Sequence, residues 1–299
     1  MPGGSQSNSY QNTWRRNGVG PLALQKTDRS DFMRQQHLPA AAVPEYDEVV
    51  DRNNITFLQT PGDWKIVDGD LAMTRRGDIM VNSPEYSALF RLVNWWRFNY
   101  PVMHVMFHAV FPLAGEREPL EEELESLFKD AAKKSPHPMS SFDYDAFHRI
   151  NDAMGAEEVA CGVYAGAIVI AISNAIQSFR SDLDGKSEEW DEAVPQYGNC
   201  SFGQVIVASA NNVRHADEWA TTVAPTRQQL LSMRVLSSAL DEPLDPPDGS
   251  RHRFGREVSP EILQVICNGD MAALEKAFFA FAKDLHRLIQ ARKLSNAPP

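Results

Sequence analysis

Residues 157–180, EEVACGVYAGAIVIAISNAIQSFR, decide the fold, because they contain the longest apolar stretch of the chain. Apolar residues lie almost all round the helix that this segment predicts, so other elements must surround it. The stretch Val159 to Ile172 is too short to span a bilayer comfortably, which favours a buried core helix. Gly162 and Gly166 leave a notch on this helix where a neighbouring backbone can approach closely.

Further helices are expected on both sides of this core helix. Ser83-Pro84-Glu85 is a helix start with a hydroxyl N-cap and a proline at the first position, and Ser259-Pro260-Glu261 repeats it. Pro101 ends or kinks the helix that starts at residue 84. The other predicted helices cover residues 102–113, 116–134, 142–154, 201–222, 226–240, 259–267 and 270–293, with a polar loop at 181–199.

Two regions without this helical pattern precede the predicted helices. Residues 1–45 are rich in Gly, Ser, Asn, Gln and Pro and predict a disordered arm. Short strand-like runs at 64–67, 71–74 and 79–81, separated by Gly-Asp turns, predict a β-hairpin or small meander within residues 46–82. We therefore expect a mainly α protein, with a multi-helix bundle at 83–294 and a frayed tail at 295–299.

Composition and charge restrict the class of protein. An apolar fraction of 43% and a charged fraction of 23% are typical of a soluble globular protein. The net charge of −11 argues against a broad binding surface for nucleic acid or an anionic membrane. The three cysteines are far apart and the N-terminus lacks the apolar centre of a signal peptide, so we expect a cytoplasmic protein without disulfides or a membrane span.

A second segment, residues 200–222 (CSFGQVIVASANNVRHADEWATT), carries the candidate functional residues. It predicts a helix that is apolar in its first half and polar in its second. At helical spacing Asn211, His215 and Glu218 share a face, and Arg214 and Asn212 flank it. This is where an imidazole, a guanidinium, two amides and a carboxylate come together at short range in the sequence.

The polar half of this helix has a structural and a functional interpretation. In the structural one, Arg214 and Glu218 form an ion pair, His215 bonds to a neighbouring helix, and Trp219 packs in the core. In the functional one, His215 exchanges protons, Arg214 neutralises charge on a phosphate-like group, and Glu218 holds the imidazole tautomer. A third alternative is that this face only docks a partner.

The region around Pro101 contains a second set of polar residues. His104 and His108 lie four residues apart, but no Asp, Glu or Cys lies within the next turn, so no metal site is predicted. Arg97 and Asn99 precede His104, so an arginine, an amide and an imidazole also follow one another here. The sequence also lacks the Gly-rich phosphate-binding loop, GxSxG, HExxH and GxGxxG motifs, and we expect no cofactor.

The run Asn211-Asn212-Val213-Arg214-His215, in a mainly helical chain, resembles the HEPN-type helical proteins. Many of these are metal-independent ribonucleases of toxin–antitoxin and anti-phage systems, in which an arginine, a polar residue and a histidine cluster at a dimer interface. The resemblance implies that His215 is a general acid or base on an RNA 2′-hydroxyl and that Arg214 stabilises the transition state. The family places its arginine four to six residues before its histidine, whereas here the two are adjacent.

Two functional hypotheses follow from the sequence. The first is a metal-independent ribonuclease or defence- or toxin-associated protein acting through Asn211, Arg214, His215 and Glu218, with RNA or a protein as partner and a homodimer implied by the resemblance. The second is a non-catalytic helical interaction, immunity or assembly protein, which the acidic charge and the absence of catalytic motifs favour. Whether the chain is an enzyme stays open at this point.

Overall fold

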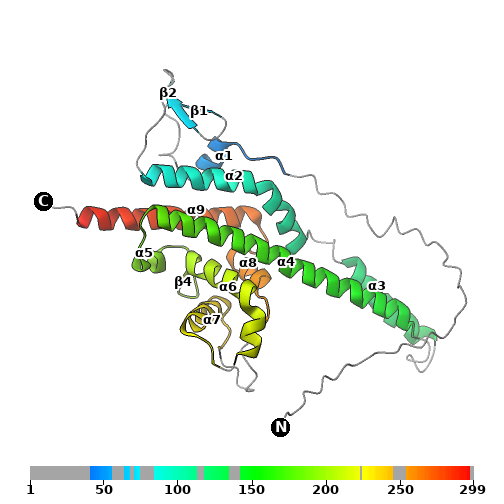
Figure 1. The fold of residues 1–299 in the computed structure, drawn as a ribbon. Coiled ribbons are helices and arrows are strands. Elements are labelled where there is room, and N and C mark those ends of the chain that lie inside the picture. The colour runs from blue at the N-terminus through cyan, green and yellow to red at the C-terminus, as the bar shows by residue number, and fades with distance from the viewer. Residues whose placement is uncertain are drawn as a thin grey trace, which may run out of the picture. The chain divides into compact units, whose positions relative to one another are not determined.

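The computed structural model describes residues 41–55, 64–67, 71–74, 84–112, 118–134, 142–222, 224–244 and 254–296 (Figure 1). All of them belong to the second of two units in the chain, Ala40–Pro299. The mainly α prediction is confirmed. The helices are α1 (Tyr46–Arg52), α2 (Pro84–Val110), α3 (Glu118–Lys134), α4 (Tyr144–Asp182), α5 (Ser187–Glu192), α6 (Phe202–Thr221), α7 (Arg227–Leu240), α8 (Ser259–Cys267) and α9 (Met271–Ser295). The strands are β1 (Trp64–Val67), β2 (Leu71–Thr74), β3 (Gln196–Tyr197) and β4 (Cys200–Ser201).

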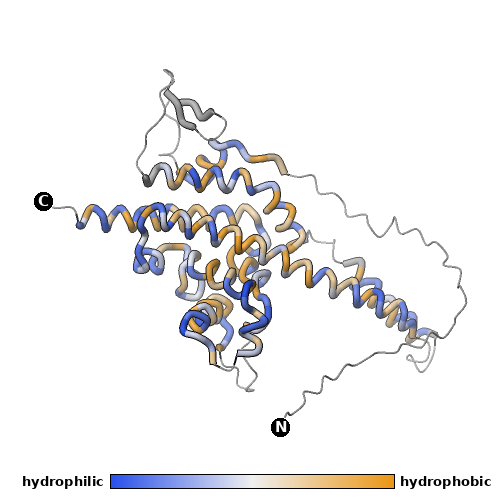
Figure 2. Tube along the Cα trace, viewed as in Figure 1, coloured by the Kyte–Doolittle hydropathy of each residue, from blue (hydrophilic) through white to orange (hydrophobic). Residues whose placement is uncertain are grey.

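The C-terminal half of α4 is the central helix of the described core, as the sequence predicts. It packs against α2, α6, α8 and α9, and its buried residues include Ile168, Val169, Ile172, Ile176 and Phe179. Figure 2 shows apolar segments recurring along α4 and α9. Each Å² of apolar surface that is removed from water contributes ~25 cal/mol of free energy, and this burial stabilises the assembly of these helices.

By length and composition alone, α4 is a candidate membrane span among the described helices. Its most apolar window has a mean hydropathy of 2.0, and 44% of that window is buried inside the fold. The core helix of a soluble protein also meets these criteria, and the side of α4 that packs on α2 and α6 is such a core surface.

The prediction of two helices at 142–154 and 157–180 is wrong, because α4 runs unbroken from Tyr144 to Asp182. Gly155 lies where the break was expected, and nothing lies within 4 Å of the position its Cβ would take. A single glycine costs a helix only about 1 kcal/mol. Packing at both ends, against α3 and against the core, is sufficient to carry the helix through it.

Pro101 does not end the helix in which it lies. α2 is one helix from Pro84 to Val110, rather than two, and Figure 1 shows it bent along its length. Proline removes one backbone hydrogen bond and bends a helix. The buried side chains of Trp96 and Met103 flank Pro101 and hold both halves of α2 in the core.

The N-terminal region differs in part from the prediction. α1 lies at the start of the segment predicted as β, because Tyr46, Val49 and Val50 are buried at helical spacing. The predicted strands at 64–67 and 71–74 are present and antiparallel, with Trp64 opposite Thr74. The predicted run 79–81, residues 1–40 of the predicted arm and residues 297–299 of the predicted tail lie outside the described residues.

The polar loop predicted at 181–199 contains α5 and strand β3, which pairs antiparallel with β4. Trp190 of α5 is buried and stacks edge-on against Phe281 of α9, with ring centroids 5.1 Å apart. The sequence does not predict α5, because most of its residues are acidic or polar.

The carboxylate of Glu275 on α9 joins three helices inside the protein. It accepts hydrogen bonds from Arg52 Nε at 2.6 Å, Asn53 Nδ2 at 2.7 Å and Trp96 Nε1 at 2.8 Å. Glu275 is 4% exposed, so these donors replace the water that an ionised carboxylate needs. α1, α2 and α9 are thereby fixed in register next to the core.

Candidate functional site on helix α6

The local sequence explains where α6 begins. Ser201 Oγ accepts from the amide of Gln204 at 3.2 Å, while the amide of Ser201 donates to Gln204 Oε1 at 2.9 Å. This reciprocal capping box satisfies amide groups that the first turn of a helix leaves free. Phe202, Val205 and Ile206 are fully buried beyond it, so the apolar half of α6 is anchored before the polar half begins.

The two asparagines of the predicted site have different roles. Asn212 is fully buried; its Nδ2 donates to the carbonyls of Phe254 and Arg256 at 2.9 and 3.0 Å, and its Oδ1 accepts from the amide of Val258 at 3.0 Å. Asn211 is half-buried and donates to Ser232 Oγ on α7 at 3.2 Å. Asn212 therefore holds the chain before α8 in place, and of the two only Asn211 remains a candidate for the site.

His215 and Glu218 form a surface pair. His215 Nδ1 lies 3.2 Å from Glu218 Oε2, and the side chains are 46% and 63% exposed. This distance allows the carboxylate to accept a hydrogen from Nδ1, which would leave Nε2 directed away from Glu218.

Arg214 is exposed, and no described residue forms a hydrogen bond or ion pair with it. The predicted ion pair between Arg214 and Glu218 is therefore wrong, because Glu218 contacts His215 instead. The predicted bond from His215 to a neighbouring helix is also not formed with any described residue. Arg214 precedes His215 on α6, and its exposed guanidinium is available to bind an anion.

Trp219 packs in the core, as predicted, and is 1% exposed. Its Nε1 has no hydrogen-bond partner among the described residues. Because Trp219 is buried and His215 is 46% exposed, the imidazole is not covered by the indole. Arg214, His215 and Glu218 are thus exposed on the polar half of α6, and Asn211 is half-buried beside α7.

The second set of polar residues, around Pro101, does not form a site. Arg97 is 8% exposed and donates to the carbonyl of Pro44 at 2.8 Å and to Asn94 Oδ1 at 2.9 Å. Asn99 donates to the carbonyl of Trp95 at 2.7 Å within its own helix. Both residues are therefore used by the fold.

His104 and His108 contact each other, with 3.1 Å between their Nε2 atoms. Burial, and then the neighbouring His108, lower the pKa of His104 from its ordinary value. In the part of the chain that the structure describes, no group of three or more His, Cys, Asp or Glu side chains is placed to hold a metal ion.

Sequence reasoning missed Glu257, which lies in the glycine notch of α4. Its carboxylate oxygens would lie 2.9 Å from a Cβ at Gly162 and 3.0 Å from one at Gly166, where Val213 also packs. Burial, followed by the charge of Glu261, raises the pKa of this carboxyl, while a hydrogen bond with Ser259 opposes the shift. The glycine spacing predicts a close neighbour, but only the fold identifies a carboxylate from a distant loop.

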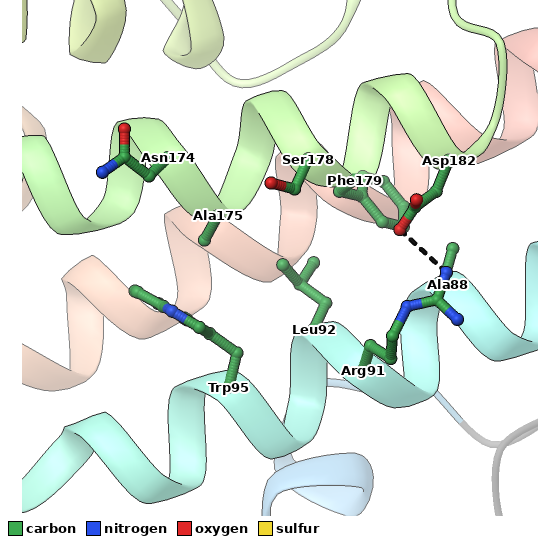
Figure 3. Close-up of a pocket in the computed structure, with 9 residues that line it drawn as sticks. All are labelled: Ala88, Arg91, Leu92, Trp95, Asn174, Ala175, Ser178, Phe179 and Asp182. Atoms are coloured by element: carbon green, nitrogen blue, oxygen red, sulfur yellow. Dashed lines mark hydrogen bonds and ion pairs between the residues drawn. The ribbon is translucent and has the colours of Figure 1, made fainter.

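A pocket of about 260 Å³ lies between α2 and α4 (Figure 3). Leu92, Trp95 and Phe179 are among its apolar lining residues, and the ion pair of Arg91 with Asp182, at 2.8 Å, lies at one end. None of the predicted site residues on α6 lines this pocket.

Comparison of the chain with protein families, curated proteins and solved structures found no match.

Proposed function

We propose that this chain is a metal-independent ribonuclease of the defence- or toxin-associated kind, acting through the exposed face of α6. The observation that carries the proposal is the 3.2 Å contact between His215 Nδ1 and Glu218 Oε2, beside an Arg214 that has no described partner. An open surface of this kind suits a polymeric substrate better than a small molecule, which requires a concave pocket.

The roles of the residues follow from their positions. His215 Nε2 takes the proton of an RNA 2′-hydroxyl while Glu218 accepts from Nδ1–H and stabilises the imidazolium that forms. The 2′-oxygen attacks the adjacent phosphorus, the bond from phosphorus to the 5′-oxygen breaks, and that oxygen takes a proton from water as it leaves. Arg214 neutralises the charge that develops on the phosphoryl oxygens, and the Asn211 amide is a further hydrogen-bond donor on the same face.

His215→Ala tests the proposal. The variant is expected to lose RNA cleavage, or toxicity in cells, while its thermal midpoint stays within the error of wild type, because His215 is half exposed and makes one surface contact. His148→Ala, which removes an exposed histidine on α4, is the matched control and should retain activity. Wild type that leaves RNA intact, or a His215→Ala variant that cleaves normally, would refute the proposal.

A non-catalytic interaction protein is the second candidate. It is favoured by the large apolar side chains that α2 and α4 expose, such as Phe98 (56%) and Val163 (61%). Removing residues 1–40 and measuring capture of a partner tests whether the N-terminal arm takes part in the interaction. Unchanged capture would show that the arm is not needed for it. In either case the three free thiols, Cys161, Cys200 and Cys267, fit the cytoplasmic location that we propose.

A further inference from the structure

The imidazole rings of His104 and His108 lie next to each other on α2, just beyond Pro101. Their ring centroids are 4.3 Å apart, and the two Nε2 atoms are 3.1 Å apart. Four residues correspond to about one helical turn, so the two side chains share a face of the helix. The helix thus presents two imidazole nitrogens side by side.

These two nitrogens are not used by any other described group. The contact between the rings is the hydrogen bond that His104 and His108 make within the part of the chain that the structure describes. His104 Nδ1 is buried and has no partner there. Both residues are partly exposed, so a small ion can reach the pair from solvent. A ligand that takes both Nε2 atoms therefore replaces one hydrogen bond and no other.

The distance between the Nε2 atoms matches two ligands of one transition-metal ion. Zn²⁺ binds imidazole nitrogen at ~2.0–2.1 Å, so two nitrogens in a tetrahedral shell lie ~3.3 Å apart. The observed 3.1 Å corresponds to an angle of ~100° at such an ion. Imidazole suits zinc, copper and nickel, whereas Mg²⁺ and Ca²⁺ take oxygen ligands. The pair is therefore suited to a transition metal and not to a hard cation.

We propose that His104 and His108 chelate one divalent transition-metal ion of the zinc, nickel or copper kind through their Nε2 atoms. A third protein ligand is not placed beside them in the described part of the chain, so water completes the coordination shell. With Nε2 on the metal, each neutral ring carries its hydrogen on Nδ1. That atom of His104 is buried without an acceptor, which limits the affinity to the micromolar range.

Chelation joins two successive turns of α2 in the folded protein. Pro101, three residues before His104, removes a backbone hydrogen bond from the helix, and the metal ion holds the turn that follows. A ligand that binds the folded state and not the unfolded chain raises the thermal midpoint. Zn²⁺ at about ten times its dissociation constant should raise the midpoint by roughly 3–6 °C.

Calorimetric titration of the full chain, without a polyhistidine tag, with zinc chloride tests this inference. Wild type is expected to bind Zn²⁺ with a micromolar dissociation constant and to show no such binding of Mg²⁺. His104→Ala and His108→Ala should each weaken Zn²⁺ binding at least ~10-fold, because losing even an indirect partner of a metal ligand costs about that much. Alanine is the best helix former, so both variants should fold.

His148→Ala is the matched control, because it removes an exposed histidine of α4, and it should bind Zn²⁺ as wild type does. The zinc-dependent rise in thermal midpoint should persist in this variant and disappear in His104→Ala and His108→Ala.

Three results would overturn the inference. These are a wild type that binds no Zn²⁺ at millimolar concentration, a His104→Ala or His108→Ala variant that binds Zn²⁺ as tightly as wild type, and equal binding of Mg²⁺, which would identify a carboxylate site. The cleavage proposed for α6 uses no metal ion and is measured separately. Zinc binding and RNA cleavage can therefore fail independently.

Discussion

The side-chain oxygen of Asn212 accepts a hydrogen bond from the backbone amide of Val258 at 3.0 Å, in the interior of the protein. The same amide side chain donates to the carbonyls of Phe254 and Arg256. One residue in the middle of α6 thus satisfies three backbone groups of the segment that leads into α8. Its neighbour Asn211 donates one side-chain hydrogen bond, to Ser232 of α7.

Asn212→Ala should destabilise the protein much more than Asn211→Ala. The first change leaves three backbone groups near the core without a partner, at ~1–3 kcal/mol for each one that water cannot reach, so we expect a loss of at least ~3 kcal/mol. The second removes one part-buried bond and should cost about 1 kcal/mol. Urea unfolding of both variants measures the difference, and equal losses would contradict the assignment of Asn212 to the fold.

Glu275→Ala should be among the most destabilising changes on α9. It leaves Trp96 Nε1 without its acceptor, removes one of the two acceptors of Asn53 Nδ2, and removes the charge that pairs with Arg52, at a cost of about 3–5 kcal/mol. Arg52→Ala should cost only ~1 kcal/mol, because its side chain is 47% exposed and the carboxylate keeps its other two donors. Thermal and urea unfolding of the two variants will rank them; the reverse order would be inconsistent with the described hydrogen bonds.

Two glycines in helices should respond to alanine in opposite directions. Gly155 has nothing within 4 Å of its Cβ position, so Gly155→Ala should stabilise α4 by about 0.5–1 kcal/mol. A Cβ at Gly203 would lie 2.5 Å from Phe281 Cζ and 2.6 Å from Trp190 Cζ2, so Gly203→Ala should destabilise by ~1–3 kcal/mol. Loss of stability in Gly155→Ala would show that α4 is not helical, or not open, at that position.

Glu257→Gln should change how stability depends on pH. The pKa of this carboxyl is raised in the fold above its ordinary value of 4.5. The unfolded chain therefore releases this proton at a lower pH than the folded protein does. This group therefore makes wild type less stable as pH rises through the window above 4.5. Relative to wild type, Glu257→Gln should gain stability between acidic and neutral pH, and urea unfolding at several pH values checks this. Parallel stability curves would mean that the carboxyl is not held in a protonated state by its surroundings.

The sequence predicts the helices of the C-terminal half well, because their caps and apolar spacing agree. Ser201 and Thr226 are N-caps, each with a glutamine three residues later, and α6 and α7 begin there. The break expected near Gly155 is wrong, and Pro101 does not end α2, although the bend of α2 agrees with the kink that a proline also predicts (Figure 1). Both helices continue because residues on either side of the local signal are packed in the fold. The burial of Met103 beyond Pro101 is a tertiary effect that the local sequence does not contain.

The arrangement of side chains on α6 follows from the sequence only in part. Helical spacing correctly groups Asn211, His215 and Glu218 on one face, but it does not reveal that Asn212 is fully buried by a loop more than 40 residues away. Spacing also allows Glu218 to pair with Arg214 or with His215, and side-chain geometry decides for His215. The sequence does not predict the position of Glu257, because the glycines that form the notch on α4 and the carboxylate that lies in it come from separate parts of the chain.

Analysis of the RNA ends that the wild-type protein produces, in the presence of a metal chelator, is the most direct test of the central claim. Attack by the 2′-oxygen, with His215 as the base, predicts fragments that end in a 2′,3′-cyclic phosphate and begin with a 5′-hydroxyl, and predicts that His215→Ala yields none. Intact RNA after incubation with wild type, or the same fragments from His215→Ala, would contradict it.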